Sequence, residues 1–174
     1  VLGYVGVMAS WFDWDSVIRL ANLATGCDIH LIGPCEGHQP GVLPKNIKVL
    51  PPISQDTVYA TMQRFDAGLI PFKKNNLTDY VDPVKFYEYR ALGLPVLTTR
   101  FGEMRLRALE RGVSYLEDID SVDALMAAID EVTSQEELNA FREAHQWDRH
   151  FDAVDFFQAS QPISDHCAAI KNVP

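Results

Sequence analysis

The sequence predicts an α/β fold, a doubly wound parallel sheet of the Rossmann type. Short apolar runs that end in glycine or proline recur along the chain, as expected for buried parallel strands. Helical patterns separate these runs, and such alternation implies parallel pairing through right-handed crossovers. With 174 residues, 47% hydrophobic and 22% charged, the chain has the size and composition of one globular domain. We expect this domain to cover residues 1–159 and residues 160–174 to form a tail.

Six segments are expected to form the sheet, with helices between them. The strands are predicted at residues 2–7, 28–32, 48–50, 67–70, 95–98 and 113–116. Apolar side chains at helical spacing follow the first strand and stop at Gly26, and a second helix is expected over about residues 55–64. Asp13 and Asp15 stand at the start of the first helix, where carboxylates favour the helix dipole.

The next helix is predicted between a loop and a buried strand. Asp82 is a good N-cap, Pro83 suits the first helical position, and Gly93 supplies a left-handed stop. Lys85 lies in the first turn, where the dipole already presents positive charge. A cation there is unfavourable unless an anion occupies the spot, so the segment indicates a phosphate site. Glu88 lies one turn further on the same face and can accept hydrogen bonds from hydroxyl groups.

The chain becomes helical after residue 118. Asp120 is expected to cap a helix, and Ser134 with Glu137 forms a capping box for the next one. A last amphipathic helix is suggested by aromatic and apolar residues at helical spacing. The face of the first of these helices comprises Val122, Leu125, Met126, Ile129 and Val132, and that of the last comprises Trp147, Phe151, Val154 and Phe157. We expect these extra helices to follow the sheet.

Charge and cysteine content exclude several classes of function. The formal charge of −9 opposes nucleic-acid binding, because the phosphate backbone would be repelled. Cys27, Cys35 and Cys167 lack metal-ligand spacing, and the simplest interpretation is a reduced, cytoplasmic setting. No apolar run approaches the ~20 residues needed to cross a bilayer, and no signal peptide is evident.

The third helix also carries a resemblance. The run Lys85-x-x-Glu88-Tyr89-x-Ala91-x-Gly93-x-Pro95-Val96 resembles the nucleotide-sugar-binding segment of glycosyltransferases with the GT-B fold, closest to the retaining "group 1" enzymes of bacterial polysaccharide biosynthesis. Runs elsewhere in the first 100 residues follow the family's order. They are Tyr4-Val5-Gly6, Trp11-Phe12-Asp13, residues 30–34, 46–50 and 65–72.

The resemblance implies roles for individual residues. Glu88 would bind the ribose hydroxyls, while Lys85 and the helix N-terminus would hold the diphosphate and stabilise it as it leaves, which makes Lys85 the candidate catalytic residue. The base would rest near residues 50–53. Further candidate contacts of the donor are Pro83, Val84, Gly6, Thr78 and Pro52. Gly6 allows close approach of the backbone to a ligand, and Thr78 belongs to the loop 72–81 that leads into the helix.

Two departures from the family pattern limit this transfer. Tyr80 stands where many members have a second glutamate that reads the donor sugar, and residues 6–11 lack the basic pair that many members place on the diphosphate. Asp13-Trp14-Asp15 matches the Asp-x-Asp metal motif of another glycosyltransferase fold, but helix capping is the better interpretation. We therefore expect no metal and no cofactor, with the donor, such as a UDP-sugar, as a substrate.

The resemblance covers only the second half of a two-domain transferase. We expect an N-terminal acceptor domain to be absent from this chain, and the chain alone to bind donor weakly and to be inactive. The whole protein would be a hexosyltransferase acting on a glycan or lipid-linked acceptor, cytoplasmic or peripheral at the inner face of the membrane. The aromatic C-terminal face would be covered by the missing half or by a second copy in a homodimer.

Three alternative functions share part of this sequence pattern. A dinucleotide-binding oxidoreductase needs Gly-x-Gly-x-x-Gly after the first strand, which the run from Gly3 to Met8 does not supply. A sugar-nucleotide epimerase of the same fold binds the same ligand and stays open. A non-catalytic interaction module, supported by the aromatic C-terminal face, also stays open.

Overall fold

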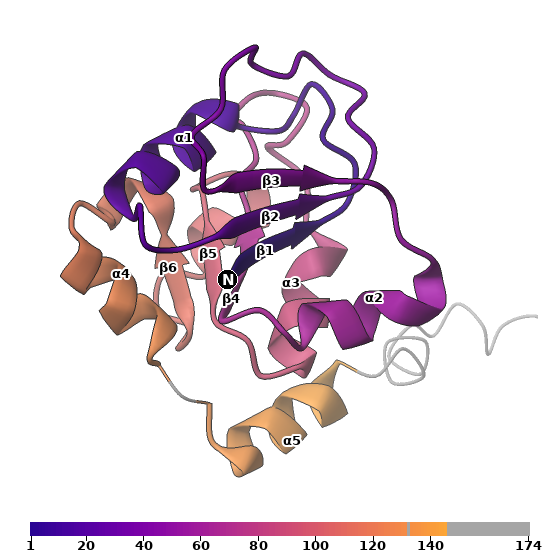
Figure 1. Ribbon diagram of the computed structural model, residues 1–174. Coiled ribbons are helices and arrows are strands. Elements are labelled where there is room, and N and C mark those ends of the chain that lie inside the picture. Colours follow the sequence, from indigo (N-terminus) through magenta and orange to yellow (C-terminus); the bar gives the residue numbers. More distant parts are fainter. Residues whose placement is uncertain (132, 146–174) are drawn as a thin grey trace, which may run out of the picture.

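The computed structural model describes residues 1–131 and 133–145. Six parallel strands form one open sheet in the order β3-β2-β1-β4-β5-β6 (Figure 1). The strands are β1 (Leu2–Val5), β2 (Ile29–Ile32), β3 (Ile47–Leu50), β4 (Ala67–Ile70), β5 (Val96–Thr98) and β6 (Val113–Tyr115). The predicted α/β, Rossmann-like fold is thus confirmed.

Helices cover both faces of the sheet (Figure 1). On one face, α1 (Trp14–Leu23) and α4 (Val122–Ile129) share a core with inward side chains of the strands. On the other face, α2 (Gln55–Met62), α3 (Val84–Ala91) and α5 (Gln135–Ala144) enclose a second core. Two short 3₁₀ helices, η1 (Gly102–Leu106) and η2 (Leu116–Asp118), flank β6. No helix within residues 1–131 and 133–145 is long and apolar enough to cross a membrane.

The predicted elements exist with small shifts at their ends. β1 stops at Val5, two residues before the predicted end, and α2 stops at Met62. Asp13 caps α1 as expected, because its carboxylate accepts a hydrogen bond from the Ser16 amide at 3.1 Å. The Ser134–Glu137 capping box of α5 is also present.

The start of α4 differs from the prediction. Ser121, not Asp120, caps this helix, since the Ser121 hydroxyl accepts from the Ala124 amide at 3.2 Å. Serine is as good an N-cap residue as aspartate, and Ser121 directly precedes the first residue of α4. Leu125 and Ala128 face the core, whereas Val122 and Met126 are 48% and 41% exposed. Val132 and the predicted aromatic helix at 147–157 lie outside the described residues, as does the tail at 160–174.

Helix α3 packs against the sheet through the ring of Tyr89, which lies over a glycine of β4. A Cβ atom added to Gly68 of β4 would lie 2.3 Å from the Tyr89 ring, so the ring occupies the space that this glycine leaves. The buried Tyr89 hydroxyl donates to the Gly3 carbonyl and accepts from the Val5 amide, both at 3.3 Å. Tyr89 is thus a packing residue, and it fixes α3 to β1 and β4.

The switch point of the sheet lies between β1 and β4, where the chain order reverses. In parallel sheets the helices run antiparallel to the strands, so the loops after the strands and the N-termini of the helices share one edge. Here the loops after β1 and β4 are joined: the Lys73 amide donates to the Trp11 carbonyl at 2.7 Å, and Phe12 bridges to Phe72. This carboxyl edge is where a Rossmann-like fold binds its ligand.

Candidate functional site

Helix α3 begins at the carboxyl edge without a side-chain cap. Its first residue is Val84, and its N-cap is Pro83, which has an extended backbone at φ −78° and ψ 123° and provides no side-chain hydrogen bond. The prediction that Asp82 is the N-cap is therefore wrong. The physical reason is that the Asp82 carboxylate is bound by other groups, so the first-turn amides of α3 receive no side-chain acceptor from it.

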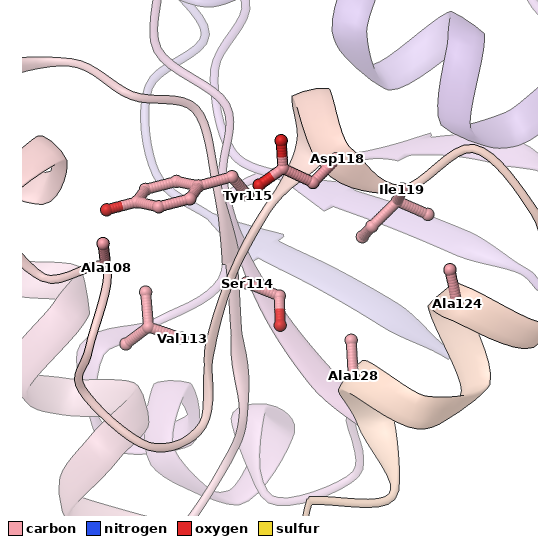
Figure 2. A pocket seen from close by; sticks show the side chains of 8 residues that line it. All are labelled: Ala108, Val113, Ser114, Tyr115, Asp118, Ile119, Ala124 and Ala128. Carbon is pink, nitrogen blue, oxygen red and sulfur yellow. The ribbon is translucent and has the colours of Figure 1, made fainter.

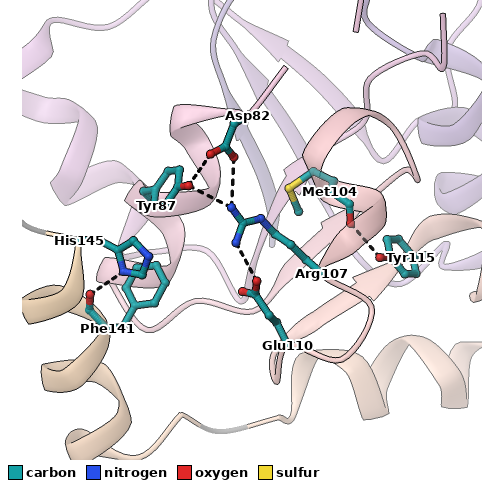
Figure 3. A network of polar contacts seen from close by, with 8 residues as sticks. All are labelled: Asp82, Tyr87, Met104, Arg107, Glu110, Tyr115, Phe141 and His145. Atoms are coloured by element: carbon teal, nitrogen blue, oxygen red, sulfur yellow. Dashed lines mark hydrogen bonds and ion pairs between the residues drawn. The ribbon is translucent and has the colours of Figure 1, made fainter. Parts of the chain in front are cut away.

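Those groups are shown in Figure 3. The Tyr87 hydroxyl donates to Asp82, and Arg107 donates to the other Asp82 oxygen from Nη2 at 3.2 Å. The same Nη2 lies 3.0 Å from the Tyr87 hydroxyl, and Arg107 Nη1 donates to Glu110 at 2.7 Å. Burial, and next the hydrogen bond to Asp82, raise the pKa of the Tyr87 hydroxyl. It therefore stays a donor at neutral pH.

Arg107 is itself firmly placed. Its guanidinium carbon lies 4.0 Å from the centre of the Phe86 ring and 5.5 Å from that of Tyr87. Only 15% of the side chain is exposed. Burial lowers the pKa of Arg107, but the hydrogen bond and charge of Glu110, together with the charges of Tyr87 and Asp82, outweigh this and raise the pKa overall. The group is thus a permanent cation beside the start of α3.

Lys85 and Glu88 form an ion pair on the first turns of α3. Lys85 Nζ lies 2.6 Å from Glu88 Oε2, and the two side chains are only 25% and 21% exposed. The structure therefore brings together the two residues that the sequence assigned to phosphate and ribose. An ordinary pair across one turn of an exposed helix contributes only ~0.3 kcal/mol.

The other predicted donor contacts are spread along the carboxyl edge. Gly6 directly follows β1, and the exposed Pro52 follows β3. Val84 is 59% exposed at the start of α3, while Pro83 is buried. Their contacts with a donor stay predictions.

Thr78 has a structural role in its loop. It is 1% exposed, and its hydroxyl donates to the Lys73 carbonyl and accepts from the Asn75 amide at 3.2 Å. The Asn75 side chain in turn accepts from the amides of Leu77 and Thr78. A donor contact of the Thr78 side chain would require this loop to open, so the geometry favours loop folding as its function.

Two glycines let the loops after β1 and β2 approach each other. Gly33 has φ +140°, and a Cβ there would lie 2.2 Å from the Gly6 carbonyl oxygen. The Gly6 amide donates to the Ile32 carbonyl at 2.9 Å. Both backbone groups of Gly6, the predicted ligand contact, are therefore in contact with the end of β2: its amide is bonded to Ile32, and its carbonyl packs against Gly33.

The two pockets described here lie away from these residues. One, of about 220 Å³, lies at the free edge of the sheet between β6 and α4 (Figure 2). Its lining consists of Ala108, Val113, Ser114, Tyr115, Asp118, Ile119, Ala124 and Ala128. The other lies at the amino edge near Asp28 and Asn46. Neither of these two is lined by a predicted donor residue.

Metal ligands are not grouped in this site. Within residues 1–131 and 133–145, no three of His, Cys, Asp and Glu are placed to hold a metal ion. Asp13 is used as a cap, as predicted from its place at the start of a helix. Cys27 and Cys35 are free thiols.

Arg107 was not among the residues predicted from the sequence. Its only signal is the run of arginines in residues 100–111, which has no spacing that points to α3. The contact joins Asp82 and Arg107 across 25 residues. This contact forms only when the chain folds, so local sequence spacing does not predict it.

Comparison with solved structures identifies a glycosyltransferase of similar fold. The chain aligns with AviGT4, a glycosyltransferase involved in avilamycin A biosynthesis, with a TM-score of 0.68 and 13% identity, over 92% of this chain and 52% of AviGT4. It thus spans about half of that enzyme and shares the fold of that half. A Thermobaculum terrenum O-GlcNAc transferase mutant aligns with a TM-score of 0.44 and 17% identity, over 82% of this chain and 30% of that one; a score at this level does not establish a common fold. No protein-family model and no curated protein sequence match the chain.

Proposed function

We propose that this domain is the donor-binding half of a glycosyltransferase that transfers a sugar from a nucleoside diphosphate to an acceptor. The observation that carries the proposal is the pairing of Lys85 with Glu88 on an uncapped helix start beside the switch point. The likeness to half of AviGT4 supports the same assignment at the level of the fold. The donor is a nucleotide sugar such as a UDP-sugar, and the acceptor is a glycan or lipid-linked glycan of polysaccharide biosynthesis.

The residues of α3 divide the work between diphosphate and ribose. The first-turn amides carry partial positive charge, and Lys85 adds a full charge on the same turn. Together they stabilise the diphosphate as negative charge builds on it during departure. The Glu88 carboxylate accepts hydrogen bonds from the ribose hydroxyls. This assignment needs no metal, and retention of the anomeric configuration and a hexosyltransferase reaction follow from the family resemblance alone.

The partial burial of the ion pair separates this proposal from an ordinary surface pair. Exposed lysines gain little from being held in place, and the entropy of fixing a long side chain opposes it. Lys85 is three-quarters covered although its first-turn position opposes the dipole. A bound diphosphate removes this conflict, because it supplies the anion that the helix end and the ammonium group both favour.

The test is binding of nucleoside diphosphates to the 174-residue chain. We expect one or more of UDP, GDP and ADP to raise the melting temperature in a dose-dependent way, as preferential binding to the native state requires. No shift with any nucleoside diphosphate at millimolar concentration would contradict the proposal and favour a non-catalytic interaction module.

Replacement of Lys85 tests the assigned role. Lys85→Ala should weaken binding of the diphosphate by ~1.5–3 kcal/mol, the scale of a charge-assisted hydrogen bond, and leave binding of the nucleoside unchanged. Lys45→Ala is the control, since Lys45 is an exposed lysine at the opposite edge of the sheet. Equal losses of the two ligands in Lys85→Ala would refute the role.

A further inference from the structure

The start of α3 contradicts its own sequence preference. Aspartate is among the best N-cap residues and proline is favoured at the first helical position, so Asp82-Pro83 should start the helix one residue earlier. Local preference would thus place the Asp82 carboxylate on the amides of Val84 and Lys85. The structure instead has Pro83 in the N-cap position with an extended backbone. Conflicts of this kind concentrate at functional sites.

Two side chains bind the carboxylate and hold it away from the first-turn amides of α3. The Tyr87 hydroxyl and Arg107 Nη2 both donate to Asp82. Glu110 accepts from Nη1, the other terminal nitrogen of the guanidinium. Arg107 is fixed by stacking on Phe86, and it is 85% covered, so its position is not that of a loose surface arginine. Figure 3 shows the carboxylate of Asp82 turned toward Tyr87 and Arg107.

We propose that Arg107, together with Tyr87, is a positioning group that withholds the Asp82 carboxylate from the first turn of α3 and so keeps this turn open to the diphosphate. The inference rests on the proposed function of the site. A carboxylate that capped α3 would occupy the amides and would place a negative charge next to Lys85, and both effects oppose binding of an anion. Arg107 acts through Asp82 and need not touch the ligand.

The binding experiment uses UDP and the full 174-residue chain. Arg107→Met should weaken UDP binding by about fivefold or more, the factor that corresponds to loss of amides to a cap. Arg107→Met with Asp82→Ala should restore affinity, because alanine cannot cap. Arg107→Met with Asp82→Asn should stay weaker than the alanine combination, because asparagine lacks the charge but caps as well as aspartate.

These combinations separate the proposal from two simpler causes. If loss of positive charge were the cause, the alanine and asparagine combinations would bind alike, and if loosening of the fold were the cause, neither would recover; either result overturns the proposal. Arg105→Met, an exposed arginine two residues away, should bind as wild type. Should Arg107→Met not fold, Tyr87→Phe removes one donor to Asp82 and should weaken binding by a smaller factor that Asp82→Ala again restores. Absence of that rescue overturns the proposal.

A second readout needs no ligand. If Asp82 moves onto the helix in Arg107→Met, the Lys85 amide gains an acceptor, and its hydrogen exchange should slow relative to wild type while amides in α1 do not change. Unchanged or faster exchange at Lys85 overturns the proposal. If wild type binds no nucleoside diphosphate, the proposed function fails, and the exchange measurement still decides whether Arg107 controls the helix end.

Discussion

If the proposed function is correct, the Glu88 carboxylate interacts with two groups, the Lys85 ammonium group and the ribose. In this structure its carboxylate neutralises Lys85 at 2.6 Å. In the donor complex the same carboxylate would accept from the ribose, while the ammonium group would turn to the diphosphate. The electrostatic change for Lys85 would be small, because its ammonium group would leave one anion, the Glu88 carboxylate, for another, the diphosphate. Under this proposal, Glu88 would determine both how strongly the ribose is bound and how readily Lys85 can move to the phosphate.

This double role gives an expected outcome for Glu88→Gln. The variant keeps the shape and one acceptor but loses the charge, so it should bind UDP roughly tenfold more weakly, since hydrogen bonds to charged groups contribute ~1.5–3 kcal/mol. Binding of inorganic pyrophosphate should not weaken, because Lys85 is freed. Titration calorimetry with the two ligands measures both effects.

A deoxy ligand supplies the control. Wild type should prefer UDP over 2′-deoxy-UDP, and Glu88→Gln should show much less preference, as coupling between the two changes requires. If wild type binds the two ligands equally, Glu88 is not the ribose ligand, and its pairing with Lys85 is the better account of its position.

At the scale of elements, the loop after β2 depends on Gly33. Its φ of +140° and the 2.2 Å between a Cβ and the Gly6 carbonyl oxygen leave no room for a side chain. Gly33→Ala should lower the free energy of unfolding by at least about 2 kcal/mol, through backbone strain and displacement of Gly6. Urea denaturation measures this change.

Gly26 is the matched control for Gly33. A Cβ at Gly26 would have nothing within 4 Å. Gly26→Ala should therefore change the free energy of unfolding by only a few tenths of a kcal/mol. Equal effects of the two substitutions would show that the contact between the loops after β1 and β2 contributes nothing.

The capping box of α5 gives a dependence of stability on pH. Hydrogen bonds from the Ser134 backbone and side chain, and next from Arg111, lower the pKa of Glu137 to about 2. A carboxylate with a lowered pKa stabilises the fold above its ordinary pKa, and this contribution is lost as pH falls from about 4.5 toward 2. Wild type should thus lose more melting temperature over this range than Glu137→Gln. Parallel losses would contradict the role of the capping box.

Two aspartates show where prediction of elements succeeds and fails. Asp13 and Asp82 were both predicted to cap a helix. Asp13 does so because its hydrogen bonds are local, within three residues. Asp82 does not, because Arg107 binds it from 25 residues away. Local patterns contain the first kind of contact and not the second, so the order of strands and helices was predictable and the state of the helix end was not.

At the scale of the whole molecule, the proposed site predicts that binding of a nucleoside diphosphate does not require a metal ion. The diphosphate would be neutralised by Lys85 and helix amides, with Asp13 engaged as a cap. The affinity of the chain for UDP should therefore be unchanged in excess chelator. A tenfold loss, ~1.4 kcal/mol, on removal of divalent ions would show that a metal shares the charge of the diphosphate.

The sequence also predicted that the candidate residues gather at the carboxyl edge of the sheet, and their binding of a donor stays a prediction. The pairing of Lys85 with Glu88 and the place of Gly6 after β1 follow from short motifs and from the rule that ligands bind at the switch point. The buried hydroxyl of Thr78 could not be predicted, because the acceptor on Lys73 exists only once the loop folds. Side-chain exposure in loops is set by three-dimensional packing, which sequence spacing does not describe.

The seat of Tyr89 has a mechanical consequence. The Tyr89 ring fills the space that Gly68 leaves, and its hydroxyl is hydrogen-bonded to β1. Helix α3 therefore cannot rotate or shift without disturbing two central strands. If the proposed function is correct, the helix that carries Lys85 and Glu88 would therefore already be in its final position when a donor binds. Adjustment to donor sugars of different size would then have to come from the loops on either side of α3, so substitutions in these loops should alter the choice of sugar and leave the affinity for the nucleotide unchanged.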